Sequence, residues 1–329
     1  MRARLIAAFD RLADVREKSD GEIARLLREM EIDIAVDLKG YTQDSRPGIL
    51  AHRPAPVQVH YLGFPGTMGA DYIDYIISDP TIVPPEHESF YTEKIALLPD
   101  TYQGNDAKRA IAEATPTRAE AGLPEHGFVF CCFNNNFKIL PEMFAIWMRL
   151  LGAVEGSVLW LLEDNPAAAR NLKHEAASRG IAPARLIFAP RASYEAHLAR
   201  QPLADLFLDT LPYNAHTSAS DALWVGLPIV TCLGTTFAGR VAASLLEAAG
   251  LPELVTDSLS AYEVVTLKLA REPSALSALK TRLGQNRSTH PLFDTARFTR
   301  NLEAAYATMW QRHTQGLPPA GFAVALPPG

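Results

Sequence analysis

Short apolar runs that alternate with helical stretches are the feature of this sequence that most constrains its fold. Several runs rich in Val, Ile, Leu and Phe have the length and composition of buried strands. Helical stretches lie between the later runs, among them Glu142–Leu151, Pro166–Ser178 and Tyr194–Arg200. This alternation is typical of a parallel sheet with helices on both faces, and it predicts an α/β fold. The predicted strands are Ile32–Leu38, Val57–Leu62, Tyr75–Ser78, Ile95–Leu98, Phe128–Phe133, Val158–Leu162, Leu186–Ala189, Leu206–Asp209 and Ile229–Leu233.

The chain of 329 residues is predicted to divide into two lobes. A polar, Ala-rich segment at residues 102–123 interrupts the alternation and is interpreted as a connector. Residues 124–290 carry five predicted strands and form the second lobe, whereas residues 1–101 predict a first lobe that is incomplete at its start. Residues 291–314 are expected to hold a closing helix, and the Pro- and Gly-rich residues 315–329 a disordered tail.

Composition argues against several functional classes. The 31 basic and 37 acidic residues give a net charge of −6, which argues against binding to nucleic acid phosphates. The three cysteines, Cys131, Cys132 and Cys232, are odd in number and two are adjacent, so no disulfide framework is expected and a reducing cytoplasm fits best. No C-x-x-C, H-E-x-x-H or D-x-D spacing predicts a metal site, and no apolar run approaches the roughly 20 residues that span a bilayer.

The segment most informative for function follows the predicted strand Leu206–Asp209. Residues 211–218 read Leu-Pro-Tyr-Asn-Ala-His-Thr-Ser and lead into a predicted helix that ends at Trp224. Free amides and the helix dipole at such a start favour a diphosphate at the carboxyl edge of a parallel sheet. His216 lies on this loop beside two hydroxyl groups and has little apolar packing to explain it, which favours a functional role.

Asp221 has two interpretations that the spacing does not decide between. Thr217 or Ser218 is the predicted N-cap of the helix, and both hydroxyls add side-chain donors where the diphosphate would lie. Ser218 and Asp221 have the spacing of a capping box, which requires no ligand. The alternative is that Asp221 contacts a ligand itself.

A second motif, an asparagine run that ends in Lys138, follows the predicted strand Phe128–Phe133. A lysine at a strand exit beside a diphosphate would stabilise the charge that builds on a departing nucleotide. A transferase without a metal ion needs such a group. The alternative is a solvated lysine in a turn that asparagines favour.

Two loops of the first lobe follow predicted strands. Gly63, Gly66 and Gly69 either let the backbone approach a sugar or phosphate closely or form a tight turn. Residues 39–42 and Arg46 follow the first predicted strand, where a surface loop and a site are equally good interpretations.

Taken together, these segments resemble the catalytic region of the O-linked N-acetylglucosamine transferases, which form one family of two-lobed glycosyltransferases with the Spindly proteins. The resemblance implies an α/β fold of two Rossmann-like lobes of the GT-B type, with a last helix, Ala296–Gln311, that returns across both lobes. It also implies inverting transfer from UDP-N-acetylglucosamine to Ser or Thr hydroxyls of proteins, without a metal cofactor. The matching segments are residues 36–42, 53–58, 62–67, 74–77, 133–138, 157–162, 214–221, 240–244, 288–293 and 306–310.

The resemblance also implies a role for each matching site residue. Lys138 would contact the diphosphate, and His216, Thr217 and Ser218 would surround its phosphates. Asp221 would hold the ribose, Asn135 would lie beside the diphosphate, and Ala192 and His197 would flank the uracil. Leu62 and Gly63 would approach the donor sugar.

Three departures from the family pattern leave alternatives open. Tyr194 stands where relatives carry a lysine near the uracil, which leaves the recognition of the base open. Asp33 stands where relatives carry a second histidine, so no general base is assigned. The helical-repeat arm that carries protein substrates is absent, which would leave that task to a separate helical-repeat chain. One alternative function is a Spindly-type O-fucosyltransferase that uses GDP-fucose, although His216 favours a UDP-sugar. Another is a catalytically inactive nucleotide-sugar-binding protein, because the first lobe is predicted to be incomplete.

Overall fold

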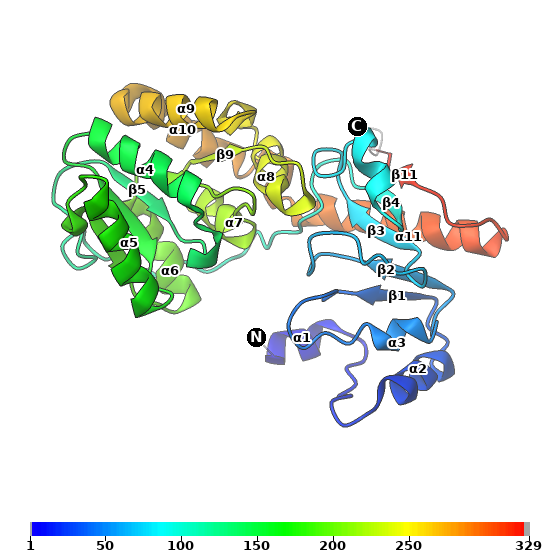
Figure 1. The fold of residues 1–329 in the computed structure, drawn as a ribbon. Helices are drawn as coiled ribbons and strands as arrows, with labels where there is room; N and C mark the ends of the chain where they lie inside the picture. Colours follow the sequence, from blue (N-terminus) through cyan, green and yellow to red (C-terminus); the bar gives the residue numbers. More distant parts are fainter. Residues whose placement is uncertain (1, 326–329) are drawn as a thin grey trace. The chain divides into compact units, whose positions relative to one another are not determined.

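The computed structural model describes residues 2–325 and places them in two compact units. Within the described residues, unit 1 comprises residues 2–77, 89–96 and 305–322, and unit 2 comprises residues 78–88, 97–304 and 323–325. Each unit contains a sheet with adjoining helices (Figure 1). The units differ from the predicted lobes, because residues 78–88 and 97–101 pack with unit 2.

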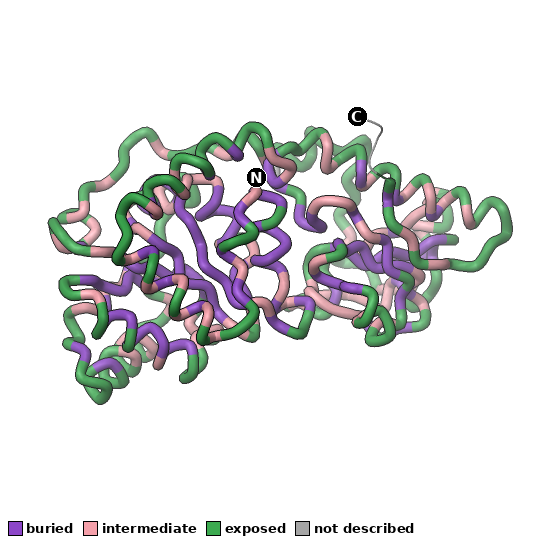
Figure 2. Tube along the Cα trace, turned by 90° about the horizontal axis from the view of Figure 1, so that it is seen from above, coloured by how far each residue is buried: buried purple, intermediate pink, exposed green. Residues whose placement is uncertain are grey.

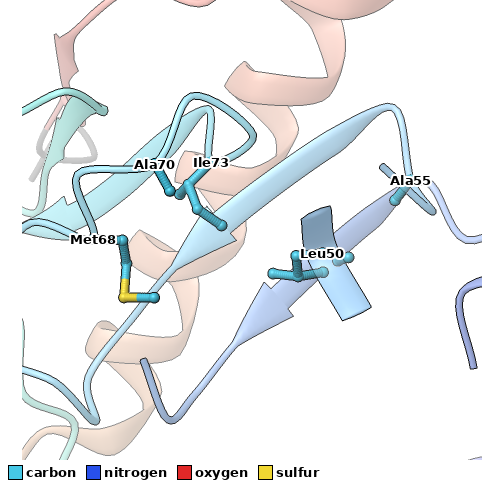
Figure 3. Close-up of a cluster of buried hydrophobic side chains, with 6 residues drawn as sticks. Leu50, Ala55, Met68, Ala70 and Ile73 are labelled. Atoms are coloured by element: carbon cyan, nitrogen blue, oxygen red, sulfur yellow. The ribbon is translucent and has the colours of Figure 1, made fainter. Parts of the chain in front are cut away.

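Unit 1 is built on a five-stranded sheet with the order β1-β2-β3-β4-β11, in which β1, β2 and β3 run parallel. The side chains of Ala35, Leu50, Ala55, Met68, Ala70 and Ile73 form a buried cluster beside these strands (Figure 3). The strands are β1 Ile34–Asp37, β2 Val57–His60, β3 Tyr75–Ser78, β4 Lys94–Leu97 and β11 Phe322–Ala323. The helices at the start of this unit are α1 Arg2–Ala8, α2 Asp20–Glu29 and α3 Gly48–Ala51.

Unit 2 is built on a six-stranded sheet with the order β10-β9-β8-β5-β6-β7, and all its neighbouring strands are parallel. The strands are β5 Val129–Cys132, β6 Val158–Leu162, β7 Leu186–Ala189, β8 Leu206–Leu208, β9 Ile229–Cys232 and β10 Val255–Thr256. The α-helices are α4 Pro141–Ala153, α5 Pro166–Ser178, α6 Tyr194–Arg200, α7 Thr217–Trp224, α8 Val241–Ala248, α9 Leu259–Arg271 and α10 Pro273–Asn286. Short 3₁₀ helices cover Pro85–Phe90, Asn136–Lys138, Pro183–Arg185, Gln201–Leu203, Phe237–Gly239, Pro252–Leu254 and Pro291–Phe293.

The last helix, α11 Thr295–Thr314, contributes its first half to unit 2 and its second half, from Ala305, to unit 1. Buried residues concentrate in the strands, whereas loops and outer helix turns are exposed (Figure 2). Within the described part of the chain, no helix has both the length and the apolar character required to cross a bilayer.

Each of the nine predicted strands overlaps an observed one, whereas two observed strands have no counterpart in the prediction. β10 makes the second sheet six-stranded instead of five-stranded. β11 lies inside residues 315–329, which were expected to be disordered, because it adds to the edge of the first sheet. Residues 326–329 of that expected tail lie outside the described residues. Both strands have two residues, too few to show a hydrophobic period.

The loops after β1 and β2 pack closely against each other in unit 1. The Asp37 carboxylate accepts hydrogen bonds from the amides of Lys39 and Gly40, at 2.8 and 3.1 Å, and so shapes the turn after β1. A Cβ atom at Gly63 would lie 2.2 Å from the Leu38 carbonyl oxygen, so only glycine fits there. Leu62, the residue before it, has a φ of 73° and an exposed side chain.

Arg46 is a structural residue of unit 1. Its Nε donates to the Asp20 carboxylate at 2.7 Å, and its Nη2 donates to the Lys18 carbonyl at 2.7 Å. The guanidinium thereby joins the loop after β1 to the start of α2.

We predict that Gly63→Ala lowers the free energy of unfolding of unit 1 by about 1–3 kcal/mol, because the methyl group would collide with backbone atoms that cannot rotate away. The matched control is Gly66→Ala in the same loop, whose Cβ would meet only the Phe64 ring at 3.5 Å. Urea denaturation of both variants measures the difference. Equal stability of the two variants would contradict the packing described for Gly63.

Candidate active site

The carboxyl ends of β5 and β8 mark the place where the strand order of unit 2 reverses. The chain builds outward from β5 through β6 to β7, returns to β8 on the other side of β5, and continues to β9 and β10. Loops leave such a pair of neighbouring strands in opposite directions, and ligands of open α/β sheets bind in the crevice between them. Lys138 follows β5, and His216 follows β8.

A buried carboxylate shapes the loop between β8 and α7. Asp209 Oδ1 accepts hydrogen bonds from the amides of Thr210 and Ala215, at 2.8 and 2.6 Å, and thus closes the loop on itself. Asp209 Oδ2 accepts a hydrogen bond from Thr231 of β9 at 2.6 Å. Burial raises the pKa of Asp209 to about 6, although these hydrogen bonds and the charge of Lys138 lower it.

A hydrogen-bonded chain joins the end of β5 to the first turn of α7. Asn134 Nδ2 donates to Thr210 Oγ1 at 2.8 Å, and the Ser218 hydroxyl donates to Asn134 Oδ1 at 2.5 Å. The hydroxyl proton of Ser218 is therefore used within the protein, whereas the Thr217 side chain is exposed. The motif after β5 and the motif after β8 thus meet, as a shared site requires.

Lys138 lies at this junction. Its Nζ donates to the Asn214 carbonyl at 2.8 Å and lies 3.8 Å from the centre of the Tyr213 ring. Burial lowers the pKa of Lys138 to about 8, against the opposing effect of Asp209. An ammonium group has three protons, so this one keeps donors for a ligand. The interpretation of Lys138 as a freely solvated lysine is wrong, because the side chain is half-buried and bonded.

His216 stacks on Tyr213, whose ring also contacts the Lys138 ammonium. Its ring lies 4.9 Å from the Tyr213 ring, and its Nε2 lies 3.1 Å from the Ala238 carbonyl oxygen. A carbonyl only accepts, so Nε2 carries the proton of this imidazole. Burial, and then the charge of Lys138, lower the pKa of His216 to about 4. His216 is therefore neutral at pH 7, with its N–H committed to the loop after β9.

The first turn of α7 offers free backbone donors. The amides of Ala219 and Ser220 both donate to the His216 carbonyl, each at 3.1 Å. The amides of Thr217 and Ser218 have no acceptor among residues 2–325, as expected at a helix start. These two amides and the helix dipole can hold an anion.

The predicted helix cap and capping box are both wrong. His216, not Thr217 or Ser218, occupies the N-cap position, and no side chain caps the helix. Ser218 and Asp221 lie inside α7, so they cannot form the capping box. Local spacing suggested the motif, but the backbone of His216, at φ −108° and ψ −90°, sets the helix start earlier.

The loop after β7 and helix α6 carry the residues expected near a base. Ala192 is exposed in this loop, and the His197 ring packs edge-on against the Phe133 ring at 5.1 Å. Arg200 Nη2 lies 2.8 Å from His197 Nδ1, so Nδ1 accepts and Nε2 carries the proton. Burial, and then the charge of Arg200, lower the pKa of His197 to about 4. His197 is also neutral at pH 7.

Asp221 is buried on the inner side of α7, and two side chains bind it. The Tyr194 hydroxyl donates to its Oδ1 at 2.7 Å, and Arg109 Nη1 donates to the same oxygen at 2.9 Å. Burial raises the pKa of Asp221, whereas Tyr194 and Arg109 lower it. The sequence around Arg109 gives no sign of this contact, because no local pattern connects it to a residue so far along the chain.

The remaining predicted residues separate into two groups. Asn135, expected beside the diphosphate, is exposed at the exit of β5. Leu62 and Gly63, expected near the donor sugar, belong to unit 1 and lie at the carboxyl end of β2. Within residues 2–325, no cluster of three or more His, Cys, Asp and Glu side chains could hold a metal ion.

Comparison with known proteins identifies similar sequences and a similar structure. The model of Glycosyl transferase family 41 matches residues 1–114 and 104–302. The SEC protein of Arabidopsis thaliana, named a probable UDP-N-acetylglucosamine–peptide N-acetylglucosaminyltransferase, is 39% identical over 329 residues, covering 98% of this chain and 34% of that protein. The SPINDLY protein of Petunia hybrida, with the same enzyme name, is 33% identical over 308 residues, covering 92% of this chain and 33% of that protein.

A solved structure, that of a mutant O-GlcNAc transferase of Thermobaculum terrenum, has a TM-score of 0.86 and 34% identity, covering 95% of this chain and 60% of that one. This likeness confirms the predicted α/β fold. The chain spans about a third of the length of the curated relatives that it matches.

We predict that Lys138→Met raises the pKa of His216 above its value of about 4 and leaves the pKa of His197 unchanged. The reason is that the Lys138 charge disfavours protonation of His216, whereas His197 responds to Arg200. Imidazole ¹⁵N chemical shifts, followed as a function of pH, measure both values in one sample. A shift of both pKa values together, or of neither, would contradict the local interaction.

Proposed function

This chain belongs to glycosyl transferase family 41, and on that basis we propose that it transfers N-acetylglucosamine from UDP-N-acetylglucosamine to Ser and Thr hydroxyls of proteins, with inversion at the sugar carbon. The family resemblance inferred from the motifs is confirmed by this match. The names of the similar proteins in Arabidopsis and Thermobaculum support the same donor and reaction.

One observation carries the proposal: the Lys138 ammonium lies at the loop that leads to the free amides of α7. Its hydrogen bond places the charge beside the Asn214 carbonyl. Asn214 precedes Thr217, the first residue of the helix, by three positions. The leaving UDP gains negative charge as the bond to the sugar breaks. An ammonium and backbone amides already fixed in place stabilise such charge most effectively.

Lys138 and α7 would do in this reaction what a divalent cation does in metal-dependent transferases. We therefore include metal independence in the proposal, with no cofactor besides the donor substrate. At pH 7 neither His216 nor His197 is charged, so Lys138 would carry the positive charge that this role requires.

The rest of the donor would extend from this junction. His197 has an Nε2–H group available for a base carbonyl, and the exposed Ala192 would flank the uracil from the preceding loop. Asn135 would lie by the diphosphate, and Asp221 would hold the ribose. Leu62 and Gly63 of unit 1 would approach the donor sugar.

The cellular setting is also part of the proposal. Cys131, Cys132 and Cys232 are free thiols buried in unit 2, which supports a reducing cytoplasm. The acceptor would be a protein, and a separate helical-repeat chain would bring it to the site.

We predict that the chain binds UDP at least about tenfold more tightly than GDP, because the region beside His197 is proposed to accept uracil. Isothermal calorimetry measures both affinities, and donor hydrolysis and peptide transfer measure turnover. Tighter binding of GDP would refute the donor assignment and favour O-fucose transfer. UDP binding without any turnover would instead indicate a nucleotide-sugar-binding protein.

We predict that Lys138→Met lowers kcat about 100- to 1000-fold while the fold is retained, as the loss of one transition-state donor does.

For the wild-type chain, kcat/KM should fall as the pH rises through about 8, because the pKa of Lys138 is lowered to about 8 and only its protonated form carries charge.

The matched control is Lys268→Met, which removes an exposed lysine from α9 of the same unit and should change neither quantity. Circular dichroism checks the fold of both variants. If Lys138→Met unfolded the protein, its hydrogen bond to Asn214 would be structural, and the proposed role would be wrong.

A further inference from the structure

The two oxygens of the Asp221 carboxylate have different surroundings. Oδ1 accepts both the Tyr194 hydroxyl, at 2.7 Å, and Arg109 Nη1, at 2.9 Å. Oδ2 receives no hydrogen bond from the described part of the chain. Oδ2 is not fully buried, although the Asp221 side chain is only 6% exposed, so this oxygen keeps a small accessible surface. One carboxylate oxygen is thus used by the protein and the other is available.

Arg109 is held firmly in place for this contact. Its side chain is 8% exposed and that of Asp221 is 6% exposed, so the ion pair is almost entirely shielded from water. Its Nη2 also donates to Asn105 Oδ1, and its guanidinium lies 5.7 Å from the Phe293 ring centre. A buried arginine with several partners orients a carboxylate strongly.

The backbone on either side of Arg109 is fixed as well. The Thr295 hydroxyl donates to the Asn105 carbonyl at 2.8 Å, and the Ala112 amide donates to the Glu195 carbonyl at 3.2 Å. Residues 105–112 therefore lie between the start of α11 and the start of α6. This segment brings Arg109 to α7 from a part of the chain interpreted as a connector.

Tyr194 supplies the second donor from the first position of α6. Ser193 caps this helix by accepting a hydrogen bond from the Ala196 amide, so the backbone that carries the tyrosine is set. Burial, and then the bond to Asp221, raise the pKa of Tyr194 to about 12. The phenol therefore keeps its proton and remains a donor at pH 7.

We propose that Arg109 and Tyr194 are positioning residues that fix the Asp221 carboxylate so that its Oδ2 is presented to a ribose hydroxyl of the donor nucleotide. This inference rests on the proposed function. It assigns to the two side chains the selectivity of the site for a ribonucleotide over a deoxyribonucleotide.

The physical reason is that a hydroxyl gains most from a charged acceptor that is already oriented. With both donors on Oδ1, the carboxylate cannot rotate without losing two hydrogen bonds. A site built to bond a hydroxyl rejects an analogue without it, because the buried acceptor is then left unpaired. Without the two donors, the carboxylate turns toward other partners, and the preference for the hydroxyl weakens.

The test compares UDP with 2′-deoxy-UDP and 3′-deoxy-UDP by calorimetry. The wild-type chain should prefer UDP to at least one deoxy analogue by about tenfold or more, the effect of one hydrogen bond to a charged group. Tyr194→Phe and Arg109→Ala should each reduce this ratio severalfold by weakening UDP, with little change for that analogue. The matched control, Lys108→Ala, removes an exposed charge from the same segment and should leave the ratio unchanged.

Three outcomes would overturn the proposal: no preference for UDP in the wild-type chain, an unchanged ratio in folded Tyr194→Phe and Arg109→Ala, or equal weakening of all nucleotides. The third would mean that Arg109 acts through its charge alone. If Arg109→Ala does not fold, Tyr194→Phe decides, because it keeps the ion pair and removes one hydroxyl. Tyr194→Phe should also have no effect on the ratio in an Asp221→Asn background. A wild-type chain that binds no UDP would refute the proposed function itself, which is a separate result.

Discussion

Asp209 holds the loop on which the site depends. It lies just past the end of β8, where the strand order reverses, and a buried anion there would destabilise the fold by several kcal/mol without donors. The amides of Thr210 and Ala215 provide those donors, so the loop must close on the carboxylate. Closing the loop brings its next residues into the place where α7 begins, and the nearby Lys138 offsets part of the buried negative charge. One desolvated charge therefore positions both the loop that the Lys138 ammonium contacts and the start of α7.

The two histidines of the site are kept neutral by different neighbours. His216 faces an acceptor, the Ala238 carbonyl, and His197 faces a donor, Arg200. Both arrangements place the imidazole proton on Nε2. In His216 this N–H donates to the Ala238 carbonyl, whereas in His197 it remains available for a ligand. His216 thus uses its N–H to hold the loop after β9, whereas His197 retains an N–H donor. Because neither ring is charged at pH 7, the electrostatic attraction for an anion at this junction comes from Lys138 and the helix start.

The sequence allowed the strands to be predicted because a buried parallel strand is a continuous apolar run, and it placed Lys138 and His216 at the exits of two of them. It could not predict the strand order, which depends on pairings between distant segments. The N-cap was wrong because serine and threonine are good caps locally, whereas the backbone at His216 is set by the loop that Asp209 closes. Arg109 was missed for a similar reason, since a polar segment with no periodicity gives no sign of what its side chains reach.

Tyr194, a departure from the family pattern, changes the charge of the region proposed for the base. A lysine at this position, as the resemblance implies for relatives, would bring a positive charge to the region proposed for the base. Tyrosine keeps a donor for Asp221 without that charge, and Arg109 supplies the charge from residues 105–112. The Arg109 guanidinium forms an ion pair with Asp221, so the pair is neutral overall and adds little electrostatic attraction for a ligand. Recognition of the nucleoside would then depend on hydrogen bonds from oriented groups. The electrostatic attraction for the donor would come from the Lys138 ammonium.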